Sequence, residues 1–335
     1  MQFWVPVIGV PVRARYNRAM NKADFRRLKL GKPREVTAGL TTHEHPAVSP
    51  DSRQIAYYTG IYGSIDIAVC SLDGRLARII SPHGGNSTQP DWRPDGLAVA
   101  YRHQHDNAAK WELWETPLTG PDLTPRQLLA SPQWNYKHPV YDRAGQRITY
   151  FSEEGAAGGA YHIWVWELSS GERRQVTFGD TQMHCHPVFS PDGTRIAFHA
   201  YEGTDKSRVP GVSNLCELDL SSGAVTQLTQ GGDQYKHPFY IDDDVLVYHH
   251  EDNTDGRRRL EAMHLATREV VVLTSGKDND KHPSPFKVKG RLHLAWASKK
   301  LAAELGQDGE GLECYDIFIA PLLVGKKGKG KLKKG

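Results

Sequence analysis

The sequence predicts an all-β protein, a six-bladed β-propeller of four-stranded blades, and the first observation behind this prediction is a repeat. A histidine or glutamine stands directly before a proline at six places, 44 to 51 residues apart. These residues are His45, Gln89, His138, His186, His237 and His282. Each interval contains short segments rich in β-branched and aromatic residues, separated by turn-forming residues. A repeat of about 40 to 50 residues with four strands is typical of a propeller blade.

The fourth repeat shows the second observation, the order of strands and turns, most clearly. Its first strand is expected to begin at His186-Pro187, and the chain then turns at Ser190-Pro-Asp-Gly193. The three following segments are 194–199, 214–220 and 225–229. The other repeats contain corresponding segments with substituted turns, such as Arg143-Ala-Gly145 in the third repeat. Four strands per repeat follow from this order.

The third observation concerns the two ends of the repeat array. The sixth repeat lacks a fourth strand after residue 322, because a tail of glycine and lysine follows. Residues 33–39 match residues 174–179 and precede the first complete repeat. We therefore expect this N-terminal strand to complete the last blade, which leaves no long free sheet edge. The expected divisions are an N-terminal arm (1–32), the propeller (33–324) and a disordered tail (325–335).

The composition favours no nucleic-acid or membrane partner. The formal net charge of +3 includes six lysines after residue 325, so the remainder of the chain is slightly acidic. The apolar opening residues 1–12 have no preceding charges and are interrupted by Pro6 and Pro11, which indicates neither a secretory signal nor a membrane span. The four cysteines form no CxxC pair and favour a reducing compartment. We expect a cytoplasmic monomer.

The turns of the repeats resemble those of a known family. Ser190-Pro-Asp-Gly193, with the related turns at 49–52 and 93–96, resembles the repeats of TolB-type propellers, which are relatives of WD40 repeats. The resemblance covers about residues 33–322. It implies the propeller fold, whereas function depends on sites that vary within a fold.

Histidine at equivalent positions of five repeats predicts a ligand site on the propeller axis, because a residue that only filled a core would not need to be histidine each time. Two repeats add a second histidine two residues earlier, His43 and His184. Residues two apart on an extended strand point the same way, so each pair is expected to present two imidazoles together. Neutral imidazole is the commonest protein ligand of metals. Hydrogen bonding that only ties the blades together is the alternative.

The string Gln182-x-His184-x-His186-Pro resembles the metal-binding string of oligogalacturonate lyases, which are propeller enzymes that hold a divalent ion with three histidines and one glutamine. That family has seven blades and a longer chain, and its catalytic arginine matches no motif here. The expected ligands are a subset of His45, His138, Gln182, His184, His186, His237 and His282, with Gln89 as a further amide. The resemblance favours manganese, with zinc, iron, nickel and calcium as alternatives, and affinity is expected to fall below about pH 6.

As an enzyme of this type, the protein would cleave a uronate-containing oligosaccharide by β-elimination, with the metal neutralising the charge that develops beside the carboxylate. Candidate catalytic residues, each near the end of a second strand, are Arg102, His199, His249 and Lys299. The loops between second and third strands are expected to share a face with the histidines, and the longest, 299–313, is expected to cover it. The alternative is a non-catalytic TolB-like propeller that binds a protein, a glycan or another anionic small ligand on this face.

Overall fold

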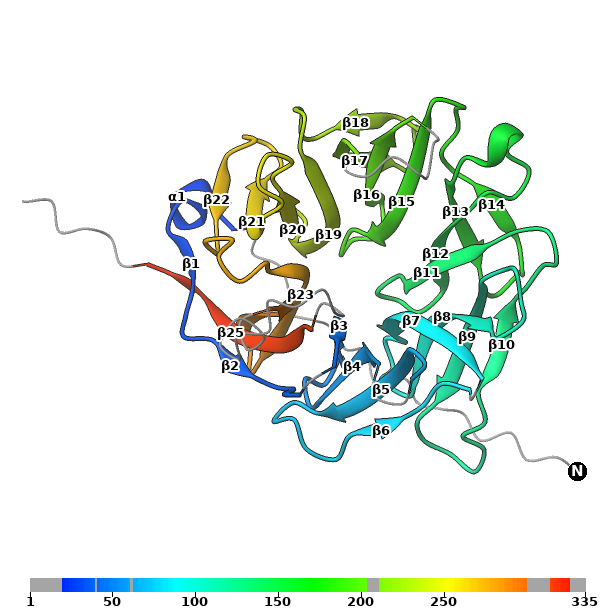
Figure 1. The fold of residues 1–335 in the computed structure, drawn as a ribbon. Helices are drawn as coiled ribbons and strands as arrows, with labels where there is room; N and C mark the ends of the chain where they lie inside the picture. The colour runs from blue at the N-terminus through cyan, green and yellow to red at the C-terminus, as the bar shows by residue number, and fades with distance from the viewer. Residues whose placement is uncertain are drawn as a thin grey trace, which may run out of the picture.

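The computed structural model describes residues 20–39, 41–60, 63–82, 84–203, 211–299 and 314–325. Within these ranges the chain forms strands arranged around a central axis, with one short helix, α1 (Lys22–Phe25), and one 3-10 turn, η1 (Ala157–Gly159) (Figure 1). The all-β propeller class is confirmed. No helix of the described ranges is long and apolar enough to span a membrane.

The first three repeats each form a separate sheet of four antiparallel strands. The first sheet contains β3 (His43–Val48), β4 (Gln54–Thr59), β5 (Asp66–Ser71) and β6 (Arg78–Ile79). The second contains β7 (Gly85–Trp92), β8 (Ala98–His105), β9 (Glu112–Pro117) and β10 (Arg126–Leu129). The third contains β11 (Tyr136–Tyr141), β12 (Arg147–Ser152), β13 (His162–Glu167) and β14 (Arg173–Gln175).

The fourth and fifth repeats share one eight-stranded sheet. The fourth repeat supplies β15 (Gln182–Phe189), β16 (Arg195–Glu202), β17 (Ser213–Asp219) and β18 (Val225–Gln227). The fifth supplies β19 (Gln234–Asp242), β20 (Val245–Glu251), β21 (Arg258–His264) and β22 (Val270–Val272). A single parallel pair, Ser213 with Gln234, joins the two halves. The six predicted repeats therefore correspond to five hydrogen-bonded sheets, because these two are linked.

The last sheet combines the two ends of the described chain. It contains β23 (Lys281–Val288), β24 (Arg291–Ser298), β25 (Asp316–Val324), β2 (Arg34–Glu35) and β1 (Leu28–Leu30). Arg34 lies opposite Ile319, so the predicted closure by the N-terminal strand is confirmed. β1 also pairs with β25, so residues 28–30, which were expected in the arm, belong to the sheet. Residues 1–19 and 326–335 lie outside the described residues.

A recurring hydrogen bond from a third-strand N–H to a Ser or Thr hydroxyl, which we call the hydroxyl latch, explains why the N-terminal segment resembles the fourth strands. In five repeats a Ser or Thr hydroxyl accepts the N–H of a residue near the start of the third strand. The pairs are Ser81 with Ile67, Thr177 with Ile163, Thr229 with Leu215, Thr274 with Leu260, and Thr37 with Ile317. Thr37 therefore reproduces at the closure the contact that the other repeats make within a continuous chain.

Each histidine or glutamine before a proline lies inside its first strand, not at its start, which corrects the expected strand boundary. All six have a positive φ between 51° and 59°. The pairing register with the second strand shifts across each of these dipeptides. Proline has no N–H to donate to the ladder, so the strand passes over the dipeptide as a β-bulge and resumes pairing beyond it.

The hydrophobic core lies between neighbouring sheets. Ile163 of β13 and Ile196 of β16, for example, belong to one buried cluster although they come from different repeats. The indole N–H of Trp92 also donates to the carbonyl of Ala47 in the preceding repeat, at 2.8 Å. Packing between sheets therefore holds the first strands around the axis and positions the bulges.

Replacing Thr37 by Val is expected to lower the free energy of unfolding by about 1–3 kcal/mol. The Thr37 hydroxyl accepts the Ile317 N–H and donates to the buried Asp316 carboxylate, so its loss leaves both without this partner. Urea unfolding followed by circular dichroism measures the change. Thr226→Val on the exposed strand β18 is the matched control, expected within about 0.5 kcal/mol of wild type. Equal effects of the two substitutions would contradict the latch.

Candidate functional site

The six bulges bring side chains of different repeats together at the axis. The imidazole rings of His45 and His282 stack with centroids 3.6 Å apart, and His237 lies 4.4 Å from His282. His186 lies 4.0 Å from His237 and 4.8 Å from His138. The structure therefore assembles five of the predicted histidines, one from each of β3, β11, β15, β19 and β23. Gln89 completes the group, with its amide nitrogen 2.7 Å from His186 Nε2.

Two further histidines extend this group, which we call the histidine cluster. His199 of β16 stacks on His186 at 4.8 Å, and His249 of β20 stacks on His237 at 4.9 Å. The complete cluster consists of His45, His138, His186, His199, His237, His249 and His282. His199 and His249 were expected only as catalytic candidates on the loop face.

The positions of His199 and His249 follow from strand pairing. Each lies opposite the residue that precedes the bulge, Cys185 for His199 and Lys236 for His249. The equivalent residues of the other second strands are Tyr58, Arg102, Phe151 and Ala297. The sequence alone did not show that these second-strand residues occupy equivalent positions. Their equivalence depends on the pairing register with the first strand, which the bulge shifts.

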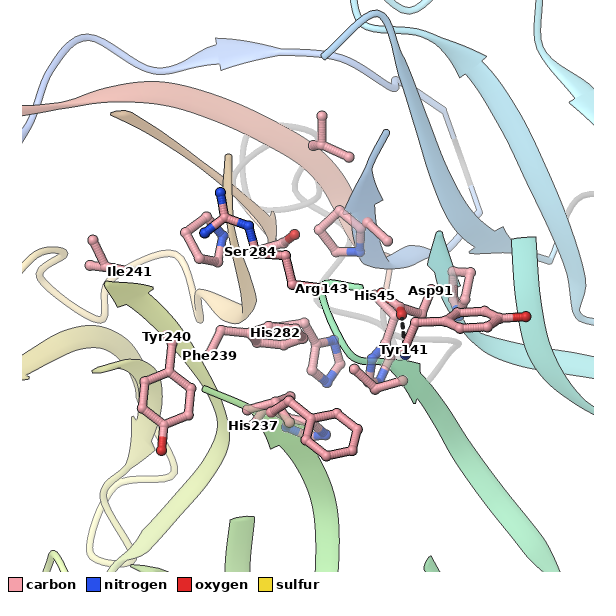
Figure 2. Close-up of a pocket in the computed structure, with 18 of the residues that line it drawn as sticks. His45, Asp91, Tyr141, Arg143, His237, Phe239, Tyr240, Ile241, His282 and Ser284 are labelled. Atoms are coloured by element: carbon pink, nitrogen blue, oxygen red, sulfur yellow. Dashed lines mark hydrogen bonds between the residues drawn. The ribbon is translucent and has the colours of Figure 1, made fainter. Parts of the chain in front are cut away.

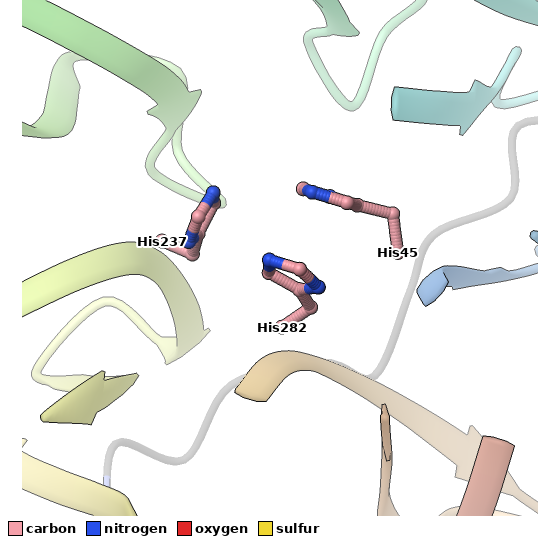
Figure 3. A group of neighbouring side chains, drawn as sticks. All are labelled: His45, His237 and His282. Atoms are coloured by element: carbon pink, nitrogen blue, oxygen red, sulfur yellow. The ribbon is translucent and has the colours of Figure 1, made fainter. Parts of the chain in front are cut away.

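Three members of the cluster have the arrangement of a metal site. One ring nitrogen from each of His45, His237 and His282 lies within 4.8 Å of the other two. Figure 3 shows the three rings, each from a different strand, gathered around a common point. An imidazole binds a metal along the in-plane lone pair of its nitrogen, at about 2.0–2.1 Å, so the stacked rings of His45 and His282 would have to turn out of their stack to hold one ion together. We call these residues the histidine triad.

Unpaired polar atoms test whether the cluster fits a metal ion. Among the described residues, several buried side-chain atoms of this region have no hydrogen-bond partner. They are the Nδ1 atoms of His138, His186, His237, His249 and His282, the Nε2 atoms of His199 and His237, and Oε1 of Gln89. Each such atom costs about 1–3 kcal/mol if it stays unpaired. A network that only tied the blades together would satisfy these atoms, so the donor set fits a bound cation better.

Burial keeps the cluster in the neutral form that binds metals. It lowers the pKa of His45, His186, His199, His237, His249 and His282 well below the ordinary value, and neighbouring imidazoles and cations add to the effect. Burial and the Arg102 cation lower the pKa of His138 to about 3. The lowered pKa values favour metal binding over protonation at neutral pH, and the expected loss of affinity below about pH 6 stays a prediction.

His184 and Gln182 lie apart from the cluster, contrary to the expected ligand set. His184 Nδ1 lies 3.0 Å from the Thr177 hydroxyl, and Gln182 is exposed at the start of β15. His43 likewise contacts Asp316, at 3.1 Å, on the far side of its strand. The left-handed φ of His45 and His186 breaks the alternation of side chains, so residues two apart do not point the same way.

Arg102 places a cation beside the cluster. Its Nε donates to the Thr88 hydroxyl at 2.5 Å, and its guanidinium carbon lies 4.1 Å from the ring centre of Trp111. Within the described ranges it forms no ion pair with a carboxylate, and burial lowers its pKa to about 10. A half-buried guanidinium in this position can interact with an anionic ligand. Lys299, in contrast, lies over the ring of Tyr315, at 5.4 Å from its centre.

On the loop side of the cluster, charged side chains contact one another. Lys281 forms an ion pair with Glu44 at 2.7 Å and lies 3.6 Å from the ring centre of Tyr315. Lys236 pairs with Glu251 at 3.6 Å. These residues precede the bulges, on the face where second strands lead into third strands. Most of the expected lid, residues 300–313, lies outside the described residues.

A cavity of about 380 Å³ opens on the opposite side of the cluster. It is lined by His45, His138, His237 and His282 and by residues that follow the bulges toward the first turns (Figure 2). Among these residues are Val140, Val188 and Phe239. The described cavity therefore lies on the turn side, whereas a site on the loop side was expected.

Neither a protein-family model nor a curated protein matches the sequence. Solved structures do match. TolB from Acinetobacter baumannii has a TM-score of 0.59 at 19% identity, over 74% of this chain and 58% of that chain. The putative TolB from Agrobacterium tumefaciens has a TM-score of 0.58 at 18% identity, over 74% and 88%. The match thus spans less than two thirds of the Acinetobacter TolB.

Oligogalacturonate lyases match over more of this chain. The enzyme from Vibrio parahaemolyticus has a TM-score of 0.53 at 11% identity, over 88% of this chain and 96% of that chain. An oligogalacturonate lyase in complex with manganese has a TM-score of 0.53 at 12% identity, over 87% and 93%. At these identities the similarity shows the fold alone. The chain is a β-propeller that resembles TolB and oligogalacturonate lyases in fold.

Acidification is expected to destabilise the metal-free protein steeply. The histidines of the unfolded chain take up protons near pH 6.5, whereas the lowered pKa values keep the cluster neutral in the folded state. The unfolded state then binds more protons, and stability falls as pH falls through the unfolded pKa. Each affected histidine contributes about 1.4 kcal/mol per pH unit between its two pKa values.

Urea unfolding with a chelator present, from about pH 7.5 to about pH 5.5, measures this dependence. His138→Asn should reduce the slope by about one proton. His293→Asn is the matched control, because His293 lies outside the cluster on β24 and its Nδ1 contacts the Arg291 carbonyl. Stability that does not change over this range would contradict the assigned protonation states.

Proposed function

We propose that this propeller binds a divalent metal ion through the histidine triad of His45, His237 and His282, and that the ion receives an anionic ligand. The observation that carries the proposal is the convergence of three imidazoles within 4.8 Å in a cluster whose buried nitrogens lack partners among the described residues. Three imidazoles leave coordination positions open, as catalytic metal sites require.

The donor chemistry narrows the choice of metal. Imidazole suits zinc, iron, nickel and copper, whereas manganese and calcium prefer oxygen ligands. Gln89 supplies an amide oxygen without a partner at the edge of the cluster, and such an oxygen favours the harder ions of this group. Manganese remains our first choice, since one structural neighbour is described in complex with it. When bound, the ion would neutralise the carboxylate of a ligand as a Lewis acid.

The proposed reaction is β-elimination from a uronate-containing oligosaccharide, in line with the names of two structural neighbours. This chain would have to supply the base that removes a proton beside the carboxylate. Arg102, His199 and His249 occupy equivalent positions next to the bulges, so each is near enough to the cluster to serve. His199 and His249 are the stronger candidates, because burial keeps their imidazoles neutral and able to accept a proton, whereas Arg102 is a cation that can hold the carboxylate of the ligand.

The second candidate function is a non-catalytic propeller that binds a protein or a glycan. It is favoured by the TolB structures, whose TM-scores of 0.59 and 0.58 exceed the values for the lyases. A monomeric state and a cytoplasmic location remain proposals. The location rests on cysteine usage, and the four cysteines are free in the described structure.

Elemental analysis tests the metal proposal directly. Protein loaded with manganese or zinc and then desalted should retain about one ion per chain. Replacing His282 by Ala should abolish this content, because it removes one member of the triad. His184→Ala is the matched control, since His184 contacts Thr177 and lies apart from the cluster. Equal metal content in both variants would refute the triad.

Turnover of oligogalacturonides in the presence of manganese tests the reaction. Product with a new double bond absorbs in the ultraviolet, and the signal should disappear with a chelator and in His282→Ala. His199→Gln should lower the rate by about 100-fold if His199 is the base, because an amide does not take up the proton. Metal binding without turnover, together with capture of a protein or glycan, would favour the non-catalytic function.

A further inference from the structure

The turn-side cavity provides a route to the histidine triad. All three triad residues line the cavity, together with His138. Figure 2 shows His45, His237 and His282 near the centre of the view, with other lining residues such as Tyr141 and Tyr240 on either side. The volume of about 380 Å³ is within the range of small-molecule sites. A ligand in this cavity would contact an ion held by the triad without displacing any strand.

The loop side offers less access within the described residues. There the side chains next to the cluster contact each other, as in the Lys281–Glu44 pair at 2.7 Å. The ammonium group of Lys137 also donates to the Tyr161 hydroxyl at 2.8 Å. Separating these pairs would cost free energy that entry from the turn side does not require.

The cavity wall is poor in free hydroxyl partners. Val140, Val188 and Phe239 contribute apolar surface. Of the lining hydroxyls, Tyr141 donates to Glu115, Tyr240 to Glu217 and Ser190 to Asp192, which leaves that of Ser284 for a ligand. The many hydroxyls of a saccharide would therefore remain partly unpaired here, at a cost of about 1–3 kcal/mol each. An apolar ligand body pays no such penalty.

Two cations lie among the lining residues near the mouth. Arg143 is exposed in the turn after β11, and Lys287 is half-buried near the end of β23. Burial and the charge of Arg143 lower the pKa of Lys287, and the carboxylate of Asp242 acts in the opposite direction. Two neighbouring cations at the mouth attract an anion.

Asp91 also lines the cavity, and its carboxyl accepts the Tyr141 N–H at 2.9 Å. Burial raises the pKa of Asp91 to about 7. A carboxylate in the lining opposes an anionic ligand, so the two cations Arg143 and Lys287 have to outweigh it.

We infer that the ligand of the metal centre is a small carboxylic acid with an apolar body, which enters through the turn-side cavity past Arg143 and Lys287. The carboxylate would reach the ion at the triad, and the apolar body would lie against Val140, Val188 and Phe239. This inference rests on the metal centre proposed above and not on the lyase reaction, because its ligand differs from the uronate oligosaccharide of that reaction.

Titration calorimetry of the metal-loaded full chain tests the inference, with 3-phenylpropanoate as the probe. The neutral analogue 3-phenylpropanol tests the need for the carboxylate, and galacturonate tests the need for an apolar body. The acid should bind at least about tenfold more tightly than either. Binding should be lost when the metal is removed.

Two variants test the route. Arg143→Glu should weaken binding of the acid about five- to tenfold, whereas the matched control Arg174→Glu, on the exposed strand β14, should not. Ala47→Phe fills part of the lining and should abolish binding while the metal content, measured on the same sample, is retained. Because Arg143 is exposed, its variant also remains informative if Ala47→Phe fails to fold.

The outcomes separate this inference from the metal proposal. If the wild-type protein retains no metal after loading, both the metal proposal and the inference about its ligand are wrong, before any acid is added. With metal present, two results would show that the ligand does not enter through this cavity. One is an equal effect of Arg143→Glu and Arg174→Glu on binding, and the other is unchanged binding in Ala47→Phe. If galacturonate binds as tightly as 3-phenylpropanoate, the ligand does not need an apolar body and that part of the inference is wrong.

Discussion

The structure depends on one backbone constraint, the left-handed conformation of the residue before proline in every repeat. All six such residues have φ between 51° and 59°, a region that non-glycine residues seldom adopt and that costs about 1–3 kcal/mol each. The packing between sheets sustains this strain. Its effect is to lift the dipeptide out of the ladder and direct the side chain toward the axis, so the same distortion creates both the bulges and the histidine cluster.

The cluster concentrates polar nitrogen at the axis, beside the cavity that four of its histidines line. Each of the seven neutral imidazoles supplies one N–H donor and one acceptor nitrogen, and several of these nitrogens have no partner among the described residues. Arg102 and the lysines that precede the bulges add positive charge around it. A cation at the centre would bind nitrogens that have no partner, and an anion beside it would offset the surrounding positive charge. This is why we propose the metal and the ligand together.

Much of the fold could be predicted from the sequence because its signals are periodic. The spacing of the dipeptides indicated the repeats, and the match between residues 33–39 and 174–179 indicated the closure, which the hydroxyl of Thr37 explains. The site was predicted less completely. The bulge at His186 turns His184 away, and strand register alone brings His199 into the cluster. The cavity depends on how the side chains that follow each proline pack against one another. The spacing of the repeats in the sequence does not reveal this packing.

The closure of the last sheet sets the order in which the protein can assemble during synthesis. Arg34 lies opposite Ile319, so the ring stays open until nearly the whole described chain has left the ribosome. His45 likewise cannot stack on its partner His282 until β23 has been synthesised. Contacts so distant in sequence form late and slowly. The nascent chain therefore exposes the imidazoles of the early repeats before their site exists, and the ion would be captured only by a completed ring.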